Sequence, residues 1–278
     1  MPLAREFLGS LPQGPQPDRQ LHRRPDGRVI GEWFGLYISS VFQPIVEGRD
    51  GTVLGHEAFL RSGLDDEGLS PWTLFSTATD DTRLIALDRL ARTVHLLNAL
   101  QANCRRPLFL NVHGRLLAAV VSDHGRAFRR VVDALGASAG EIVIETPVEA
   151  SAQPDLLAFV LRNYRSNGFR VAVNLASADQ WQRIAGVVRP DFVKIDRRKL
   201  GTLDDLLKKH AAFLSRLSGD GFKPVPPLRV FDVKGYRRAA DPAARLAVSF
   251  DALLGTAIGM LGGSIPTIAI PSIPVPGA

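Results

Sequence analysis

Short apolar segments alternate with longer amphipathic segments along most of the chain. The short segments are rich in β-branched and other apolar residues, a pattern typical of buried β-strands. They predict eight strands, at Val41–Val46, Val53–Leu60, Leu108–Val112, Ile142–Glu145, Phe169–Leu175, Asp191–Ile195, Leu228–Val233 and Phe250–Leu254.

Between these strands, apolar residues recur at steps of three and four, which places them on one face of a helix. The clearest case is the segment Thr82–Leu100, where Leu84, Leu87, Ala91 and Val94 follow this spacing. The same spacing predicts further helices at Arg115–Leu135, Pro154–Asn167, Ala178–Val187, Leu203–Leu217 and Ala239–Val248.

The connections between the strands indicate the fold class. The first two strands are joined by residues 47–51, a turn too short for a helix, so they should pair antiparallel. Helices separate most of the other strands, which favours parallel pairing. We therefore predict an α/β protein, a (β/α)8 TIM-like barrel with an antiparallel first strand. A doubly wound open sheet would produce a similar order of elements, and the opening hairpin argues against it.

The two ends of the chain differ from its middle. Residues 1–28 are rich in Pro, Gln, Gly and Arg without apolar periodicity, so we expect a flexible lead-in, with ordered structure from about Val29. The barrel should occupy residues 29–263, and residues 264–278 should form a proline-rich tail. The segment from Ala252 onward carries no charge, but its prolines and glycines would repeatedly break a membrane-spanning helix.

Composition narrows the class of partner. The net charge is +6 and the pI about 9.9, which favours an anionic ligand. The basic residues lie in scattered pairs such as Arg23-Arg24 and Lys208-Lys209, so we expect no nucleic acid polymer as partner. The single cysteine, Cys104, excludes an intrachain disulfide, and the first residues lack a signal peptide's apolar stretch. We expect a cytoplasmic protein with no membrane span.

Polar residues stand at the carboxyl ends of successive predicted strands, where a barrel builds its active site. One such residue could be a hydrogen-bonded polar group of the core, but a series on successive strands indicates a site. Oxygen donors suit Mg²⁺ or Ca²⁺, and a nearby lysine could hold a phosphate or a nucleophilic water. The series comprises Glu57, Arg61, Asn111, Glu145, Asn174, Lys194, Asp196, Asp232 and Lys234.

Several motifs in this series carry a family resemblance. FQPIV at Phe42–Val46 and GHEAFLR at Gly55–Arg61 resemble the signature of the EAL-domain family. Four later segments resemble that family's strands in the same order: LFLNV (108–112), EIVIET (141–146), PDFVKID (190–196) and FDALLGTAIG (250–259). Active members of the family use two Mg²⁺ or Mn²⁺ ions to hydrolyse cyclic di-GMP. The resemblance implies that Glu57, Asn111 and Glu145 bind metal, that Lys194 orients the attacking water, and that Gln43, Arg61 and Glu57 contact the ligand.

The departures from the family pattern concern the metal site. Where the family has two aspartates this chain has Asn174 and Leu175, and Asp232 replaces a glutamate. We therefore expect a weakened Mg²⁺ or Mn²⁺ site in which Asn174 and Asp232 are poor ligands. The resemblance then implies a non-catalytic receptor for cyclic di-GMP, a protein-interaction regulator, or both, with a protein partner and a homodimer as candidates. The alternative is a metal-dependent phosphodiesterase with low or residual activity.

Overall fold

The computed structural model describes most of the first 195 residues and four later residue pairs. The described residues are 2–46, 53–63, 70–104, 107–119, 123, 125–184, 186–188, 190–195, 223–224, 230–231, 250–251 and 259–260.

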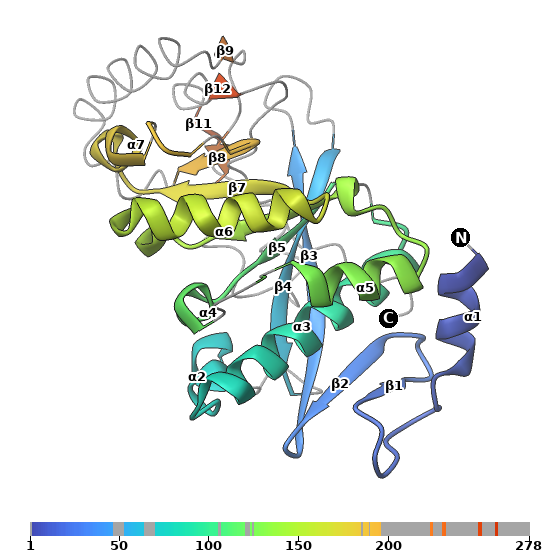
Figure 1. The fold of residues 1–278 in the computed structure, drawn as a ribbon. Helices are drawn as coiled ribbons and strands as arrows, with labels where there is room; N and C mark the ends of the chain where they lie inside the picture. The colour runs from blue at the N-terminus through green and yellow to red at the C-terminus, as the bar shows by residue number, and fades with distance from the viewer. Residues whose placement is uncertain are drawn as a thin grey trace.

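One eight-stranded sheet organises these residues, and its strands follow one another in sequence order (Figure 1). β1 to β4 pair antiparallel, whereas β4 to β8 pair parallel. This confirms the α/β class and the antiparallel pairing of the first two predicted strands. Within the described residues the sheet is open, since β1 and β8 do not pair. The strands are β1 (Leu21–Arg23), β2 (Val29–Trp33), β3 (Leu36–Val46), β4 (Val53–Ser62), β5 (Leu108–Asn111), β6 (Ile142–Thr146), β7 (Arg170–Leu175) and β8 (Phe192–Ile195).

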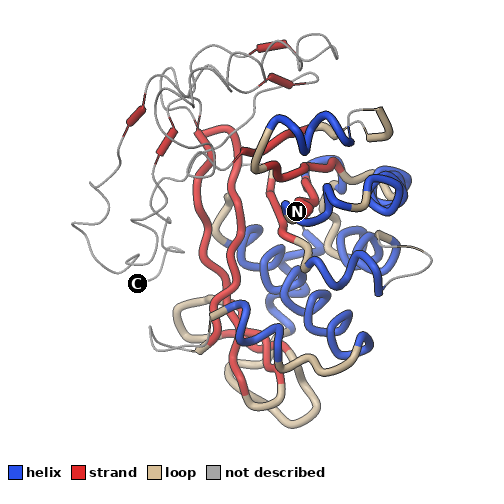
Figure 2. Tube along the Cα trace, turned by 90° about the vertical axis from the view of Figure 1, so that its left-hand side faces the viewer, coloured by secondary structure: helices blue, strands red, loops and turns tan. Residues whose placement is uncertain are grey.

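Figure 2 shows most of the described helices on one side of the long β3–β4 hairpin. Helix α3 is the longest of them; the Asp80 side chain caps its first turn by accepting from the Arg83 amide (2.8 Å). It packs against β2, β3 and β4. The helices are α1 (Pro2–Ser10), α2 (Pro71–Ser76), α3 (Asp81–Gln101), α4 (Gly114–Ala119), α5 (Arg126–Ala134), α6 (Pro154–Ser166) and α7 (Ala178–Ile184), with 3-10 turns η1 (Ala139–Glu141) and η2 (Val148–Ala152).

The prediction of a flexible lead-in over residues 1–28 is wrong. This segment contains α1 and β1, and it buries Ala4, Leu8 and Leu11 in the core. Those three residues lie at helical spacing, a signal that the surrounding prolines and glutamines mask. The next strand, β2, is fixed from α3, because the Asn98 side chain bonds both backbone groups of Val29 at 2.8 Å.

The single helix predicted at Arg115–Leu135 is also wrong, since two helices, α4 and α5, occupy this range. The Asp123 carboxylate accepts hydrogen bonds from the backbone amides of Gly125 and Arg126, both at 2.9 Å. These bonds form a turn immediately before α5, whose N-cap residue is Gly125.

The last two predicted strands are described only in part. β10 (Val230–Phe231) and β11 (Phe250–Asp251) pair antiparallel with each other, not parallel as a barrel requires, and each contributes only two residues to the pairing. β9 (Lys223–Pro224) likewise pairs with β12 (Gly259–Met260). The helices predicted at residues 203–217 and 239–248, and the tail at 264–278, lie outside the described residues. No helix in the described part of the chain has the length and apolar character needed to cross a membrane.

Candidate functional site

Gly55 sets the position of the GHEAFLR segment on β4. A Cβ at Gly55 would lie 2.5 Å from the backbone carbonyl oxygen of Pro107, so only glycine allows this approach. The same carbonyl accepts a hydrogen bond from the amide of His56 (3.0 Å). The contact joins β4 to the start of β5 and brings Glu57 into register with Phe109.

Lys194 on β8 reaches the two glutamates of β4 and β6. Its ammonium nitrogen, Nζ, lies 2.7 Å from Oε2 of Glu57 and 2.7 Å from both carboxylate oxygens of Glu145. The three side chains are largely buried, with 13%, 11% and 3% of their surface exposed for Lys194, Glu57 and Glu145. Residues 57, 145 and 194, far apart in the sequence, therefore form one cluster at the carboxyl ends of the parallel strands.

Two asparagines complete this cluster as hydrogen-bond donors. Nδ2 of Asn111 donates to Oε1 of Glu57 (3.0 Å), and Nδ2 of Asn174 donates to Oε1 of Glu145 (2.7 Å) and to the Thr146 carbonyl (3.0 Å). Each of the four carboxylate oxygens thus accepts at least one N–H. The structure brings together five of the predicted site residues: Glu57, Asn111, Glu145, Asn174 and Lys194.

The electrostatics of the cluster follow from its burial. Burial and the nearby Glu57 raise the pKa of Glu145, although Lys194 and Asn174 act in the opposite direction. Burial alone would lower the pKa of Lys194, but the carboxylates of Glu145 and Glu57 outweigh it and raise that pKa. Lys194 is therefore charged at neutral pH.

The remaining predicted site residues occupy different positions. Gln43 on β3 is buried and pairs directly with Glu57 across the hairpin, so both side chains lie on the same face. Arg61 lies four residues beyond Glu57 on that face, and its Nη1 donates to the Leu60 carbonyl (2.8 Å). Asp196, Asp232 and Lys234 lie outside the described residues. Leu175 is fully buried, and the alternation along β7 turns it to the opposite face from Asn174.

Within the described residues, this cluster offers a metal two carboxylates, those of Glu57 and Glu145. Bridging and neutralising two dications takes several carboxylates. Among the residues that the structure describes, no three His, Cys, Asp or Glu side chains gather as a metal site would need. The two glutamates that do meet are engaged by Lys194, and the asparagines present Nδ2 to them.

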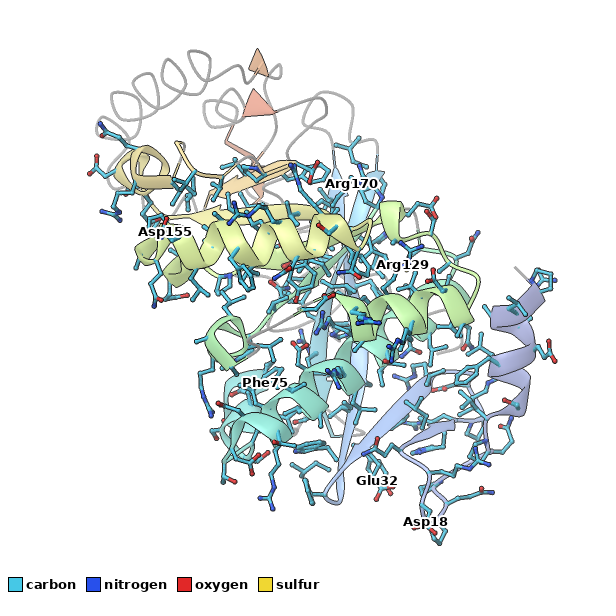
Figure 3. The ribbon with its side chains drawn as sticks, viewed as in Figure 1. Asp18, Glu32, Phe75, Arg129, Asp155 and Arg170 are labelled. Atoms are coloured by element: carbon cyan, nitrogen blue, oxygen red, sulfur yellow. The ribbon has the colours of Figure 1, made fainter. Side chains whose placement is uncertain are left out.

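A cavity of about 440 Å³ opens beside the cluster, and Asn111 and Asn174 form part of its wall. Its other walls come from β4, α2, α3 and the loop after β6. The Phe75 ring, labelled in Figure 3, stacks on His113 with ring centroids 4.7 Å apart. The cavity has the size and the largely apolar lining of a small-molecule site.

Three charged or polar residues of α3 line the same cavity, and sequence reasoning missed them. Asp88 and Arg92 form a buried ion pair, and Arg92 also donates to the Tyr164 hydroxyl (3.4 Å). His95 is buried against the Ser40 hydroxyl (2.7 Å), and its pKa is lowered to about 3 by burial and by the charges of Arg61 and Arg92. Their positions on the apolar face of α3 were the available signal, because charged residues there require partners.

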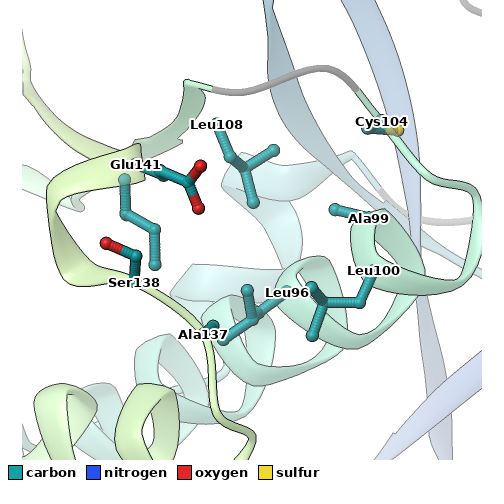
Figure 4. A pocket seen from close by; sticks show the side chains of 9 residues that line it. Leu96, Ala99, Leu100, Cys104, Leu108, Ala137, Ser138 and Glu141 are labelled. Atoms are coloured by element: carbon teal, nitrogen blue, oxygen red, sulfur yellow. The ribbon is translucent and has the colours of Figure 1, made fainter. Parts of the chain in front are cut away.

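A second pocket, shown in Figure 4, lies away from the cluster and is bordered by Cys104, Leu108 and Glu141. Its volume of about 10 Å³ is at the lower limit for one water molecule. Burial raises the pKa of the Cys104 thiol to about 11, so the thiol is protonated at neutral pH and unreactive.

Comparison with known proteins bears on the family and the fold of this chain. A family model described as the EAL domain matches residues 37–218. A second model, for the GSU0054 family of CRISPR-associated proteins, matches residues 191–269, a minor part of the chain. No curated protein matches the sequence.

Solved structures with a similar fold include three proteins, two of which are described as EAL proteins. BlrP1 of Klebsiella pneumoniae, in a manganese and cyclic di-GMP complex, has a TM-score of 0.53 and 19% identity, covering 76% of this chain and 50% of BlrP1. A standalone EAL protein from Vibrio cholerae, bound to cyclic di-GMP, has a TM-score of 0.51 and 18% identity, covering 66% of this chain and 77% of that protein. YkuI of Bacillus subtilis, with cyclic di-GMP and calcium, has a TM-score of 0.51 and 22% identity, covering 66% of this chain and 46% of YkuI. This chain thus spans about half the length of BlrP1, and the likeness at these identities establishes the fold.

Proposed function

The chain belongs to the EAL-domain family, and from this premise we propose that it is a non-catalytic member of cyclic di-GMP signalling. It binds the dinucleotide, a protein partner, or both, and does not hydrolyse the phosphodiester efficiently. A second copy of this chain is one candidate partner, which light scattering of the purified protein would reveal as a homodimer.

The observation that carries this proposal is the hydrogen bonding of Asn174. Its amide donates to Glu145 at 2.7 Å, so this strand end supplies no carboxylate to the cluster, and Leu175 faces the other side of the sheet. Hydrolysis by a two-metal mechanism needs both ions held by negative ligands. Two glutamates already bonded to Lys194 are a poor substitute for that arrangement.

Three features support retention of the ligand. Similar structures contain cyclic di-GMP. The cavity of about 440 Å³ adjoins the cluster, and a net charge of +6 favours capture of a doubly anionic molecule. Gln43 and Arg61, on the same face as Glu57, are the side chains we assign to ligand contact.

Isothermal titration calorimetry with cyclic di-GMP, with and without Mg²⁺, tests the binding. We expect similar affinities under both conditions and a loss of about 10–100-fold on Arg61→Ala, the range for losing a charge-assisted hydrogen bond. Arg83→Ala is the matched control, because this arginine is half exposed on α3 and removes the same charge. Absence of binding heat under both conditions would exclude cyclic di-GMP as a ligand and leave only the partner-binding form of the proposal.

The second candidate is a phosphodiesterase with residual activity. It is favoured by the convergence of Glu57, Asn111, Glu145 and Lys194 at one point of the fold. Chromatographic detection of the linear dinucleotide, in Mg²⁺ or Mn²⁺ and abolished by Glu57→Ala, would establish this activity and overturn the non-catalytic proposal.

A further inference from the structure

We propose that an arginine-rich face of the protein, at the amino ends of the parallel strands, docks an acidic segment of a partner protein. This arginine face is built by α5, the end of α6 and the start of β7. It gathers arginines that stand apart in the sequence: Arg126, Arg129, Arg130, Arg162, Arg165 and Arg170. The inference rests on the partner-binding form of the proposed function and states the chemistry of the partner.

Hydrogen bonds between α5 and the residues after α6 hold this face together. Nη1 of Arg129 donates to the carbonyl oxygen of Asn167 (2.8 Å), the residue that follows α6. Nδ2 of Asn167 donates in turn to the Asp123 carboxylate just before α5 (2.9 Å). Figure 3 labels Arg129 and Arg170 at the same end of α6, away from Asp155 at its start. The start of α5 and the end of α6, which carry the arginines, therefore lie next to each other.

The positive charge of this face is only partly balanced. Arg129 pairs with Asp133 at 2.7 Å, and Arg165 pairs with Asp191 at 3.0 Å. Within the described part of the chain, three exposed arginines of the face form no ion pair: Arg126, Arg130 and Arg162. Six guanidinium groups and the carboxylates of Asp123, Asp133 and Asp191 leave a net charge of +3. The face can therefore attract an anionic partner.

Three of these arginines are placed where they oppose helix stability. Arg126 is the first residue of α5, Arg129 and Arg130 follow in the next turn, and the first turn contains no acidic residue. The amino end of a helix carries partial positive charge, which disfavours cations there. Arg126 and Arg130, four residues apart, also repel each other. Residues that weaken their own helix are expected where function requires them.

The composition of the face favours an acidic protein segment over a nucleic acid backbone. Asp133 and Asp191 are 54% and 30% exposed beside the arginines, and they would repel a continuous row of phosphates. Phe159, one turn before Arg162 on α6, is 36% exposed. Aromatic and arginine side chains together are typical of protein interfaces. A partner segment with carboxylates spaced around an apolar residue therefore fits this face.

The arginine face leaves the candidate ligand site open. Arg170 is the first residue of β7, whereas Asn174, which bonds Glu145, lies four residues further along the same strand. At about 3.3 Å per residue, the two positions are about 13 Å apart along the strand. This separation lets a partner bind at one end of the sheet while cyclic di-GMP occupies the other.

Binding of a fluorescently labelled oligoglutamate peptide to the full chain tests the inference. Fluorescence anisotropy compares the wild type with the triple variant Arg126→Ala/Arg130→Ala/Arg162→Ala. We expect this variant to bind about tenfold more weakly, because three exposed ion pairs with the peptide are lost. The control Arg5→Ala/Arg19→Ala/Arg89→Ala removes the same charge from exposed arginines elsewhere. It should bind like the wild type at physiological ionic strength, where distant charges are screened.

Three outcomes of the binding test would overturn the inference. The first is equal weakening in the two triple variants, and the second is no peptide binding by the wild type. The third is tighter binding of a DNA duplex or of phosphatidylserine vesicles than of the peptide, with the same three arginines required.

Two further measurements separate docking from other roles. In urea unfolding, the Arg126/Arg130/Arg162 variant should be at least as stable as the control, because the lost charges oppose the helix dipole. A lower urea midpoint would assign these arginines a structural role and overturn the inference. Calorimetry with cyclic di-GMP should give the same affinity for this variant and the wild type. If the peptide test fails while cyclic di-GMP still binds, the receptor form of the proposed function stands without this docking face.

Discussion

Asn98 offers a sharp test of how α3 holds β2 in the folded domain. Its side chain, 1% exposed on α3, accepts from the Val29 amide and donates to the Val29 carbonyl, both at 2.8 Å. The substitution Asn98→Ala removes both bonds while leaving the helix intact. Because β2 is the neighbour of β3, which carries Gln43, the consequence reaches the site through the sheet.

The size of the effect follows from the two backbone groups left without partners. Val29 is fully buried, and an unsatisfied buried polar group costs about 1–3 kcal/mol. Two such groups give about 2–6 kcal/mol, and the better helix propensity of alanine offsets about 0.5 kcal/mol. We expect a net loss of about 1.5–5.5 kcal/mol in the free energy of unfolding, a large fraction of the stability of an ordinary domain.

Urea unfolding followed by far-UV circular dichroism measures this loss directly. The control is Arg89→Ala, an exposed position on the same helix, which should change stability by less than about 0.5 kcal/mol. If Asn98→Ala costs no more than this control, β2 is not held by α3.

Two further predictions concern the site and its surroundings. Gly55→Ala should destabilise the protein by about 1–3 kcal/mol in urea unfolding, because the added Cβ meets the Pro107 carbonyl, whereas Gly9→Ala, with open space around it, should not. His95 stays neutral in the folded protein down to about pH 3, while in the unfolded chain it takes up a proton below about pH 6.5. Stability should therefore fall as the pH drops through this window, by about 2 kcal/mol near pH 5 from this residue. The urea midpoint of His95→Gln should fall less between pH 7 and pH 5, and an equal fall in both proteins would contradict the assignment.

Much of the sheet could be predicted from the sequence because its strands carry strong apolar runs. The strands between Val53 and Ile195 and the long helix over residues 82–100 could be predicted from the spacing of apolar residues and from turn residues alone. The N-terminal elements were missed because a composition rich in Pro, Gln, Gly and Arg indicated disorder, whereas only three residues, Ala4, Leu8 and Leu11, carry the helical spacing. Helix α1 packs against α3, which lies far away in the sequence. The strands at residues 230–231 and 250–251 were expected to run parallel because a helix was predicted between them, whereas they pair antiparallel.

For the site, the sequence indicated which residues take part but not how their side chains contact one another. The strand-end rule found Glu57, Glu145 and Lys194, because polar residues are conspicuous inside apolar strands. The rule could not predict that Lys194 bonds both glutamates. Those bonds depend on the conformations of side chains that lie 137 and 49 residues from Lys194 in the sequence. The buried ion pair of Asp88 and Arg92 was missed for a different reason. Helical spacing identified the buried face of α3 from its apolar residues, and the two charged residues on that face were not considered.

The strand order has a consequence for how the protein is made. Every strand of the main sheet pairs only with its neighbours in sequence, from β1 to β8. During synthesis, each strand therefore finds its partner already outside the ribosome, and the sheet can grow one strand at a time from the N-terminus. At every stage the growing sheet has two edges, β1 and the newest strand, and the Lys194 cluster can form only after β8, the last strand of this sheet, has emerged.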